Sequence, residues 1–300
     1  MKAGFFQITR RTALASTGGL LAACGGSQAR GQAGQSGQTG QSDGLLVQVM
    51  PANTDIAVGR NRLAVAILQV GQGGQLPKPL VGADVKFRFF YPIEPQPVVK
   101  GEAAPTFRHV GDQTKGLYVA TVQLDQPGPW GLEVSGRAGT QDLAVSRVRF
   151  DVQAQSQTPA LGSPAPRSNN PTRRDVDDIK KIASEATPCN MHDLSIAQAI
   201  DLKKPVVISF TTPGFCATQY CAPQLQATQA LQAKMGDRAS FVHVEIFKDP
   251  NTRTVWETVN EWKLGTEPWT FLVDRGGLVA EKFEGPAPAD ELEAALTKLL

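Results

Sequence analysis

Two cysteines lie close together in the last third of the chain, in the stretch SFTTPGFCATQYCAPQL. They are Cys216 and Cys221, and four residues separate them. Cysteine thiolates attack disulfides and bind soft metal ions, and cysteine pairs form structural disulfides. A four-residue spacer on a turn can bring two Cα atoms within about 7 Å, which a disulfide requires. A redox pair, a metal site and a structural disulfide are therefore the three alternatives for this pair.

The first residues of the chain have the pattern of an export signal. A twin arginine, Arg10-Arg11, precedes a short apolar run from Thr12 to Ala23 that is too short to span a bilayer as a helix. The run ends in Leu-Ala-Ala-Cys-Gly, which resembles a bacterial lipobox in which Cys24 receives the lipid. We expect residues 1–23 to be a twin-arginine signal peptide and Cys24 to anchor the mature lipoprotein to the membrane.

This signal predicts an exported protein on the extracytoplasmic, or periplasmic, face of the cell membrane, where disulfides persist. With Cys24 assigned to lipid, three cysteines remain, and Cys189 is the one outside the pair. An odd number leaves at least one thiol unpaired or pairing transiently, so Cys189 is a candidate accessory redox residue. The chain has 30 basic and 28 acidic residues. Such a near-neutral balance gives no electrostatic basis for binding nucleic acid.

Composition and periodicity divide the chain behind the signal into four parts. Residues 24–43 are rich in Gly, Gln and Ser and predict a flexible tether. Residues 44–153 contain short runs of alternating apolar and polar residues separated by turn residues, which predicts an antiparallel β-sandwich of immunoglobulin-like type. Residues 154–177 are rich in Pro and Ser and are expected to be a linker. Residues 178–300 form the second expected domain.

The sandwich region carries few residues with chemical potential. Trp130 is expected in its core, and His109 in a solvated loop. The segment GLYVATVQLDQPGPWGLEV resembles the small β-sandwich modules of the YtkA/FixH type on bacterial envelope proteins. This resemblance implies an envelope β-domain and no particular activity.

Residues 178–300 predict alternating helices and strands. Ser195 and Gln198 are spaced as a capping box, so a helix should begin near Ser195. PVVISFT is a continuous apolar run, typical of a central strand, and SFVHVEIF is a second strand. Helices are expected in APQLQATQALQAKMG, TRTVWETVNEWKL and PADELEAALTKLL, the last capped by Asp290, and a hairpin in WTFLVD and LVAEKFEG. This order predicts an α/β domain with a parallel core and an antiparallel hairpin at one side.

A cysteine pair between a buried strand and the following helix resembles the thioredoxin superfamily over residues 178–300. The resemblance is carried by Cys216 after VVISF, by Pro223 early in the next helix, and by Pro268 in GTEPWTFLVD. It implies a thioredoxin-like fold and thiol–disulfide exchange without a cofactor. It also implies that Cys216 attacks, that Cys221 resolves the mixed disulfide, and that Pro268 is a cis-proline that positions an extended substrate.

The chain departs from this family in two places. The family's usual pair has two intervening residues, whereas this pair has four. A second alignment matches YCAPQ to the family's WCGPC. It makes Cys221 the attacking cysteine and puts Gln224 where the family has its second cysteine. Ser209 occupies a strand position at which many thioredoxins have a buried acid that helps move a proton. We therefore expect a slow or specialised exchanger rather than a broad reductase.

The sequence thus predicts a multidomain protein, with an immunoglobulin-like β-sandwich followed by an α/β thioredoxin-like domain. The favoured function is a membrane-anchored extracytoplasmic thiol–disulfide oxidoreductase acting on the thiols or disulfides of envelope proteins. One alternative is a copper-binding protein that uses Cys216 and Cys221 with His192 or His243, since Cu(I) prefers soft thiolates. The other is a binding protein that keeps the fold and a structural disulfide but has no enzymatic turnover.

Overall fold

The computed structural model describes residues 44–300, except 72, 218 and 219. The predicted signal peptide, the lipidation site Cys24 and the tether lie outside the described residues. In the part of the chain that is described, no helix is long and apolar enough to cross a bilayer.

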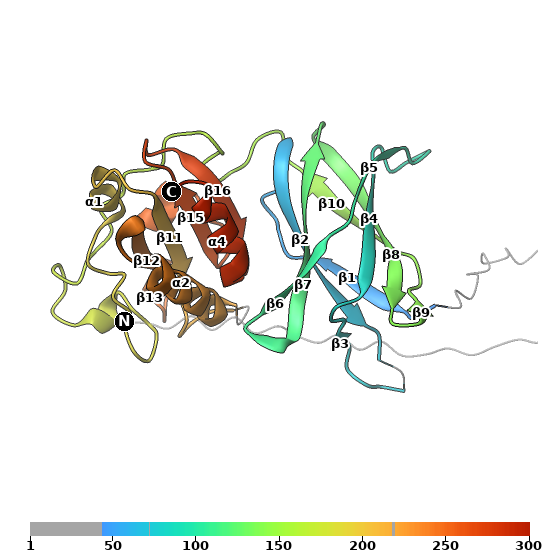
Figure 1. Ribbon diagram of the computed structural model, residues 1–300, viewed down its shortest axis with the longest axis horizontal. Coiled ribbons are helices and arrows are strands. Elements are labelled where there is room, and N and C mark those ends of the chain that lie inside the picture. The colour runs from blue at the N-terminus through green and yellow to red at the C-terminus, as the bar shows by residue number, and fades with distance from the viewer. Residues whose placement is uncertain (1–43, 72, 218–219) are drawn as a thin grey trace, which may run out of the picture. The chain divides into compact units, whose positions relative to one another are not determined.

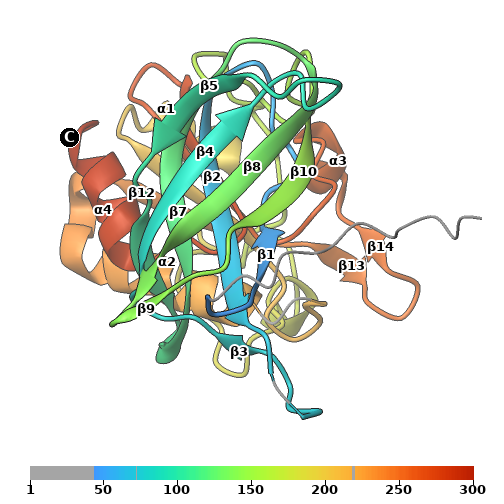
Figure 2. The ribbon, with the colours of Figure 1, turned by 90° about the vertical axis from the view of Figure 1, so that its right-hand side faces the viewer.

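Ten strands in two five-stranded sheets form the first half of the described chain (Figure 1). One sheet has the order β1-β2-β7-β6 with β3 on β2, and the other has the order β10-β8-β4-β5 with β9 on β8 (Figure 2). All strand pairs within these sheets are antiparallel. The strands are β1 (Val47–Pro51), β2 (Gly59–Gln69), β3 (Lys78–Pro79), β4 (Asp84–Phe90), β5 (Val99–Ala103), β6 (Thr106–Val110), β7 (Asp112–Leu124), β8 (Gly128–Ala138), β9 (Gln141–Asp142) and β10 (Ser146–Val152).

One apolar core lies between the two sheets. Alternate residues of β4 are buried, as expected for a strand with one face on a core. The core takes side chains from both sheets, including Leu63 and Tyr118 from one and Phe87 and Trp130 from the other. The predicted core position of Trp130 is confirmed, since only 1% of the residue is exposed. His109, expected in a loop, lies within β6 instead.

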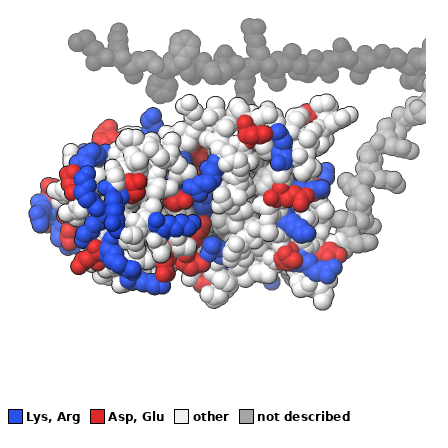
Figure 3. Space-filling view, turned by 45° about the horizontal axis from the view of Figure 1, so that its top comes forward, with Lys and Arg blue, Asp and Glu red and all other residues white. Residues whose placement is uncertain are grey.

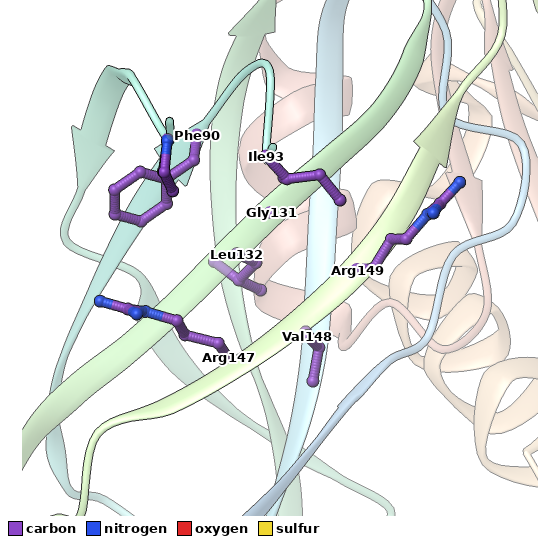
Figure 4. A pocket seen from close by; sticks show the side chains of 8 residues that line it. Phe90, Ile93, Gly131, Leu132, Arg147, Val148 and Arg149 are labelled. Atoms are coloured by element: carbon purple, nitrogen blue, oxygen red, sulfur yellow. The ribbon is translucent and has the colours of Figure 1, made fainter. Parts of the chain in front are cut away.

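A pocket on the β10-β8-β4-β5 sheet is shown in Figure 4. Its walls come from apolar residues such as Phe90 and Ile93 and from the side chains of Arg147 and Arg149. No cysteine, histidine or carboxylate lines it, so it offers no nucleophile and no proton acceptor. Cys189, Cys216 and Cys221 all lie in the second half of the chain.

The second half holds a four-stranded sheet of order β12-β11-β15-β16. Strands β11 and β12 are parallel, whereas β15 is antiparallel to both of its neighbours. The elements are the 3-10 turns η1 (Ile179–Lys181) and η2 (Gly236–Arg238), the helices α1 (Ile196–Asp201), α2 (Cys221–Met235), α3 (Glu257–Glu261) and α4 (Ala289–Thr297), and the strands β11 (Val206–Thr211), β12 (Ser240–Glu245), β13 (Phe247–Asp249), β14 (Thr254–Val255), β15 (Trp269–Val273) and β16 (Val279–Glu284).

Helices cover both faces of this sheet, which explains why all six residues of β11 are buried. Ile208 and Phe210 of β11 pack with the apolar residues of α1 and α3. Val207 points to the other face and packs with the apolar residues of α2 and α4. The predicted order of alternating helices and strands is observed with one addition, since the short strands β13 and β14 stand between β12 and α3. Two parallel strands lie beside an antiparallel hairpin, as the resemblance to a thioredoxin-like domain implies.

Three local predictions can be compared with these elements. The capping box is confirmed, because Ser195 and Gln198 exchange side-chain to backbone hydrogen bonds at the start of α1. The helix predicted in TRTVWETVNEWKL is too long, since Thr254–Val255 form β14, which pairs with β13, and α3 begins only at Glu257. Asp290 lies in the first turn of α4 rather than at its cap, which is Pro288.

Part of the segment expected to be a linker packs on the second half. The N–H of Gly162 donates to the carbonyl of Val279 at 2.8 Å, and the N–H of Ala165 donates to that of Gly277 at 2.9 Å. Further along, the indole N–H of Trp262 donates to the Ser168 hydroxyl at 3.1 Å. These bonds add the stretch from about residue 162 onward to the thioredoxin-like half.

Hydrogen bonds also join residues of the first half to residues of the second. Asp55, in the first half, accepts hydrogen bonds from the hydroxyl groups of Ser156 and Thr158 and from Lys282 of β16. Arg62 of β2 forms two hydrogen bonds with the carboxylate of Glu291 in α4, at 2.7 and 2.9 Å. Charge-assisted and bidentate contacts of this kind are stronger than neutral ones.

Basic and acidic side chains are intermingled on the face of the molecule shown in Figure 3. This mixture agrees with the small net charge of the chain, +2.

Candidate functional site

Cys216 and Cys221 lie at the corner between β11 and α2. Cys221 is the first residue of α2 and is fully buried, whereas Cys216 precedes the helix and is partly exposed. The backbone N–H of Cys221 donates to the sulfur of Cys216 at 3.3 Å. Tyr220, the cap residue of α2, supplies no side-chain acceptor. The Cys216 sulfur therefore accepts a hydrogen bond from an N–H group at the positive end of the helix, where a thiolate is favoured.

The environment of Cys221 keeps its thiol protonated. The hydrogen bond with the Cys216 side chain raises the pKa of Cys221 far above its usual range, and burial raises it further. A hydrogen bond with the Thr212 backbone offsets this only in part. The two sulfurs thus differ in role, because Cys216 is the accessible acceptor and Cys221 is the buried donor.

A carboxylate completes this corner. One oxygen of Glu267 and the sulfurs of Cys216 and Cys221 all lie within 4.8 Å of one another. Glu267 is held in place by the N–H of Ala217, which donates to Oε1 at 3.0 Å. Burial raises the pKa of Glu267, and the nearby charge of Cys216 raises it further. A carboxyl group with a raised pKa beside a protonated thiol is suited to exchanging a proton with it.

Glu267 is a candidate site residue that was not among the residues predicted from the sequence. The signal was present, since it directly precedes Pro268. The structure has a cis peptide bond between Glu267 and Pro268, just before β15, and Pro268 is buried. The cis state implied by the family resemblance is therefore observed.

Ser209 lies in the middle of β11 and is fully buried. Its hydroxyl oxygen has no hydrogen-bond partner among the described residues. No acid stands at this position of the strand, and Glu267 on the neighbouring loop is the carboxyl group that lies with the cysteine pair in the described part of the chain.

The two alignments of the cysteine pair can be compared with this geometry. Cys221 stands at the start of the helix, as the second alignment requires. Gln224, three residues later, is fully engaged, since it donates to Thr270 Oγ1 at 2.8 Å and accepts from the N–H of Ala287 at 2.6 Å. The burial of Cys221 favours the first alignment, because a sulfur that partners cannot reach cannot attack them.

A pocket begins beside the cysteine pair. Ala217 and Glu267 line one part of it. Its apolar walls include Phe247, Val255 and Leu264. This lining gives a partner's apolar side chain a place to bind next to Cys216.

Cys189, His192 and His243 meet at a second place, where Glu185 joins them. One donor atom from each of the four residues lies within 4.8 Å of the others. Nδ1 of His243 is 3.6 Å from the Cys189 sulfur and 3.1 Å from Nε2 of His192. Oε1 of Glu185 is 3.5 Å from each of these two nitrogens. The cluster is buried, and 10% of the Glu185 side chain is exposed.

Burial opposes the charged forms of Glu185, Cys189 and His243, and the hydrogen bonds and charges within the cluster together outweigh it. Burial alone would raise the pKa of Cys189, but hydrogen bonds with His192 and His243 lower it to about 7. Burial would lower the pKa of His243, but its contacts with Cys189 and Glu185 raise it. The same two histidines hold the pKa of Glu185 well below its usual range, although burial opposes this. The cluster therefore favours anionic sulfur and carboxylate beside cationic imidazole.

The structure thus separates the residues of the proposed copper site. Cys216 and Cys221 form one potential ligand group with Glu267, and His192 and His243 belong to the other with Cys189 and Glu185. Among the described residues, no histidine offers a nitrogen to the group of Cys216. Cys189, the candidate accessory redox residue, is 6% exposed and belongs to the histidine group.

No protein-family model and no curated protein matches this chain. Solved structures do resemble part of it. The thiol:disulfide interchange protein DsbE from Chlorobium tepidum is 17% identical, with a TM-score of 0.36, and the match covers 47% of this chain and 99% of that one. A second thiol:disulfide interchange protein of the thioredoxin family, from Chlorobium tepidum TLS, is 15% identical over 35% of this chain and 85% of that one, with a TM-score of 0.30. StoA from Bacillus subtilis is 19% identical over 38% of this chain and 93% of that one, with a TM-score of 0.28.

The second of these three structures is named as a thioredoxin-family protein. All three match only part of the chain, and identities this low carry no residue roles across. None of the three supports the resemblance of the first half to YtkA/FixH modules. The roles of the cysteines in this chain therefore rest on the geometry of their own corner.

Proposed function

We propose that this chain is a thiol–disulfide oxidoreductase that exchanges disulfides with protein partners. The observation that carries the proposal is the asymmetry of the cysteine pair. Cys216 is partly exposed and accepts the hydrogen bond of a helix N-terminus, while Cys221 is buried, protonated and beside Glu267. An accessible thiolate with a resolving thiol behind it is the arrangement that disulfide exchange requires.

In the first step, the Cys216 thiolate attacks one sulfur of a partner's disulfide. A bond forms between Cys216 and that sulfur, the partner's S–S bond breaks, and the other partner sulfur leaves as a thiolate. The pocket walls beside Ala217 hold the apolar side chains that flank the disulfide. Pro268, buried just before β15, directly follows Glu267 and positions the partner's chain.

In the second step, Cys221 resolves the mixed disulfide. The Glu267 carboxylate accepts the proton of the Cys221 thiol, and the resulting thiolate attacks the Cys216 sulfur. The Cys216–Cys221 disulfide forms, and the second partner sulfur leaves as a thiolate. Two electrons pass from the cysteine pair to the partner, and the same steps in reverse oxidise a dithiol. In this scheme Glu267 performs the proton transfer that Ser209 cannot perform.

The location of the reaction is proposed from the sequence. Lipid on Cys24 would hold the chain at the extracytoplasmic face of the membrane, so that its partners are thiols or disulfides of envelope proteins. The immunoglobulin-like type of the sandwich belongs to the same proposal. Labelling cells with a radioactive fatty acid tests the anchor. Label is expected on the native chain and absent from Cys24→Ser, and equal labelling of both would contradict it.

Trapping of the mixed disulfide tests the oxidoreductase proposal. In chains that also carry Cys24→Ser, Cys221→Ser should accumulate a mixed disulfide with a disulfide-containing peptide, joined through Cys216. Cys216→Ser should accumulate none, because Cys221 is buried. Cys189→Ser is the matched control and should behave as the parent. Trapping on Cys221 instead, or on neither residue, would contradict the assignment of roles.

The copper alternative would use the sulfurs of Cys216 and Cys221 with the Glu267 carboxylate, the donors that meet at the corner. Two thiolates suit Cu(I), whereas a carboxylate is a hard ligand that it does not prefer. The alternative of a structural disulfide requires a pair that is never reduced. Both alternatives predict that the chain with both cysteines does not catalyse the reduction of a disulfide-containing peptide, which separates them from the oxidoreductase.

A further inference from the structure

The buried cluster of Glu185, Cys189, His192 and His243 is outside the proposed exchange reaction. Three of its members lie within the eight-residue stretch EATPCNMH that ends at His192, and the fourth comes from β12. The loop is fixed to this edge strand, because the N–H of His243 donates to the carbonyl of Met191 at 2.8 Å. We propose that these four side chains bind one zinc ion.

The distances between the donor atoms carry the proposal. Zinc in a tetrahedral site lies about 2.0–2.1 Å from nitrogen or oxygen and about 2.3 Å from sulfur, which places its ligands roughly 3.3–3.6 Å apart. The sulfur of Cys189 and Nδ1 of His243 are 3.6 Å apart, and Oε1 of Glu185 is 3.5 Å from Nδ1 of His243. The nitrogens of His192 and His243 are 3.1 Å apart. These separations are close to those of a tetrahedral zinc site, and all four donor atoms lie within 4.8 Å of one another.

The other nitrogen of His243 supports this assignment. Nε2 lies 3.2 Å from the carbonyl oxygen of Thr211 and 2.8 Å from its hydroxyl group. A carbonyl only accepts hydrogen bonds, so Nε2 carries a hydrogen, and Nδ1 is the nitrogen that can give up its proton and present a lone pair to a metal ion in the cluster. Metal-binding histidines are held in this way by a carbonyl or carboxylate behind the ring.

The charge of Glu185 gives a second, independent indication. Its side chain is nine-tenths buried, and among the described residues its ion-pair partners are the two histidines, with no lysine or arginine. Its other oxygen, Oε2, is buried and has no hydrogen-bond partner in the described part of the chain. Burying a carboxylate costs free energy unless a cation or hydrogen-bond donors compensate it. Without an ion, the N–H of Cys189, which donates to Oε1 at 3.0 Å, and the two imidazoles compensate the carboxylate in part, and Oε2 is left without a partner among the described residues. A divalent ion would supply the charge in place of the imidazole protons.

The donor set selects zinc among the common ions. One thiolate, two imidazoles and one carboxylate are all ligands that zinc accepts, and four protein ligands in a buried position are typical of a structural site. Glu185 also lines a surface pocket with Ser184, Thr187 and Gly214, which gives the ion an access route. On binding, the imidazole nitrogens that face the ion, and any Cys189 that is still a thiol, release their protons to solvent.

A zinc ion here would stabilise the cysteine corner without taking part in the exchange. The Ser184 hydroxyl, next to Glu185, accepts the N–H of Gly214 at 3.0 Å, and Gly214 lies in the loop that leads to Cys216. Thr211, which holds His243, is the last residue of β11 before this loop. The ion would join the segment around Glu185 to β11 and β12.

The test uses the chain with Cys24→Ser, Cys216→Ser and Cys221→Ser, so that Cys189 is the one remaining cysteine. Zinc is titrated against a chromophoric chelator, and cobalt is then bound in its place. We expect one zinc per chain, a higher melting temperature with zinc, and a cobalt–thiolate charge-transfer band. Cys189→Ser should remove that band, and Cys189→Ser or His192→Gln should weaken zinc binding by about 100-fold or more.

Two further variants separate binding from folding. His109→Gln replaces the third histidine of the chain, which lies in β6, and should leave zinc affinity unchanged. Thr211→Val should weaken zinc binding by about 10-fold while the far-ultraviolet circular dichroism spectrum stays that of the parent. Absence of stoichiometric zinc in the parent, or a cobalt band that survives Cys189→Ser, would overturn the proposal.

Discussion

Cys216 and Cys221 differ because of one hydrogen bond and one difference in burial. The N–H of Cys221 at the start of α2 supports the Cys216 sulfur, and burial keeps the Cys221 thiol protonated. Glu267 lies beside both cysteines, since one oxygen of its carboxyl group lies within 4.8 Å of both sulfurs. These positions set the direction in which the proton moves during the resolving step.

Replacing Glu267 with glutamine should slow the release of partner from the mixed disulfide by on the order of 100-fold at neutral pH, because glutamine cannot accept the Cys221 proton. The pKa of Glu267 is raised by burial, and the carboxylate that accepts the proton exists only above that pKa. In the native chain, the rate of partner release should therefore fall as the pH drops through the raised pKa of Glu267. The rate in Glu267→Gln should not show this decrease. Stopped-flow measurement of release across the pH range tests it.

Glu257→Gln is the matched control for this prediction, because Glu257 is exposed in α3. It should keep the native rate and pH profile. A variant at Glu267 with the native pH profile would show that another group, or water, accepts the proton.

Local spacing predicted the positions of Cys216, Cys221 and Pro268, and the structure brings the pair and the proline loop together. The roles of Glu267 and Glu185 could not be predicted in this way. Glu267 acts through cysteines far away in the chain, and Glu185 joins its near neighbours Cys189 and His192 to the distant His243. An isolated glutamate in a sequence is most often a surface residue. The meeting of His192 and His243 with Cys189 likewise depends on how the loop packs beside β12.

At the scale of the elements, α1 shows how a short local pattern can define a helix start. Ser195 accepts the N–H of Gln198 at 3.2 Å, and the Gln198 side chain accepts the N–H of Ser195 at 2.9 Å. These two bonds satisfy backbone groups that the helix leaves open. The helix covers one face of the sheet through Ile196 and Ile200.

Ser195→Ala should lower the free energy of unfolding by about 1 kcal/mol, since the cap is lost and the helix end keeps an open N–H. Urea denaturation followed by circular dichroism measures this change. Gln198→Ala removes the reciprocal bond, and the double variant should lose less than the sum of the single variants because the bonds share one cap. Strict additivity, or no loss in Ser195→Ala, would contradict the role of the cap.

The helix α3 shows the limit of local patterns. Thr254 and Val255 continue the apolar spacing of the helix behind them, but β-branched residues also favour strands. They form β14 because β13 offers an antiparallel partner across a short turn. These two residues form a strand because β13 is available as a partner, and the spacing of apolar residues in the sequence does not show that partner.

At the scale of the whole described chain, polar contacts connect the sandwich to the thioredoxin-like half. Asp55 collects hydrogen bonds from the Ser156 and Thr158 hydroxyl groups and from Lys282. Only 6% of the Asp55 side chain is exposed. The Pro/Ser-rich composition of residues 154–177 predicted a linker, and composition alone could not show that part of this segment would pack and bond in this way.

Asp55→Asn should lower the free energy of unfolding by about 2 kcal/mol at pH 7, because hydrogen bonds to a charged group are lost. Burial would raise the pKa of Asp55, but the hydrogen bonds of Ser156, Thr158 and the Gln157 N–H, with the charge of Lys282, lower it overall. A lowered pKa contributes stability above the unfolded value, about 3.8, that is lost as the pH falls through the folded value. The difference in the free energy of unfolding between the native chain and Asp55→Asn should therefore become smaller as the pH falls.

Denaturation midpoints measured from pH 7 to pH 2 test this dependence. Asp151→Asn is the control, since Asp151 is exposed at the end of β10, and it should change stability by less than about 0.5 kcal/mol. If the stability difference between the native chain and Asp55→Asn stays constant from pH 7 to pH 2, the charge of Asp55 does not contribute to the stability of the folded chain.

The most direct test of the central claim is the redox equilibrium of the cysteine pair itself. The chain with Cys24→Ser is equilibrated in glutathione buffers of graded ratio, its thiols are blocked by alkylation in acid, and the peptides are weighed by mass spectrometry. The oxidoreductase account predicts a reversible Cys216–Cys221 disulfide that reaches the same ratio from the reduced and the oxidised side, with Cys189 alkylated throughout. A pair that never reduces, or never forms its disulfide, would contradict it.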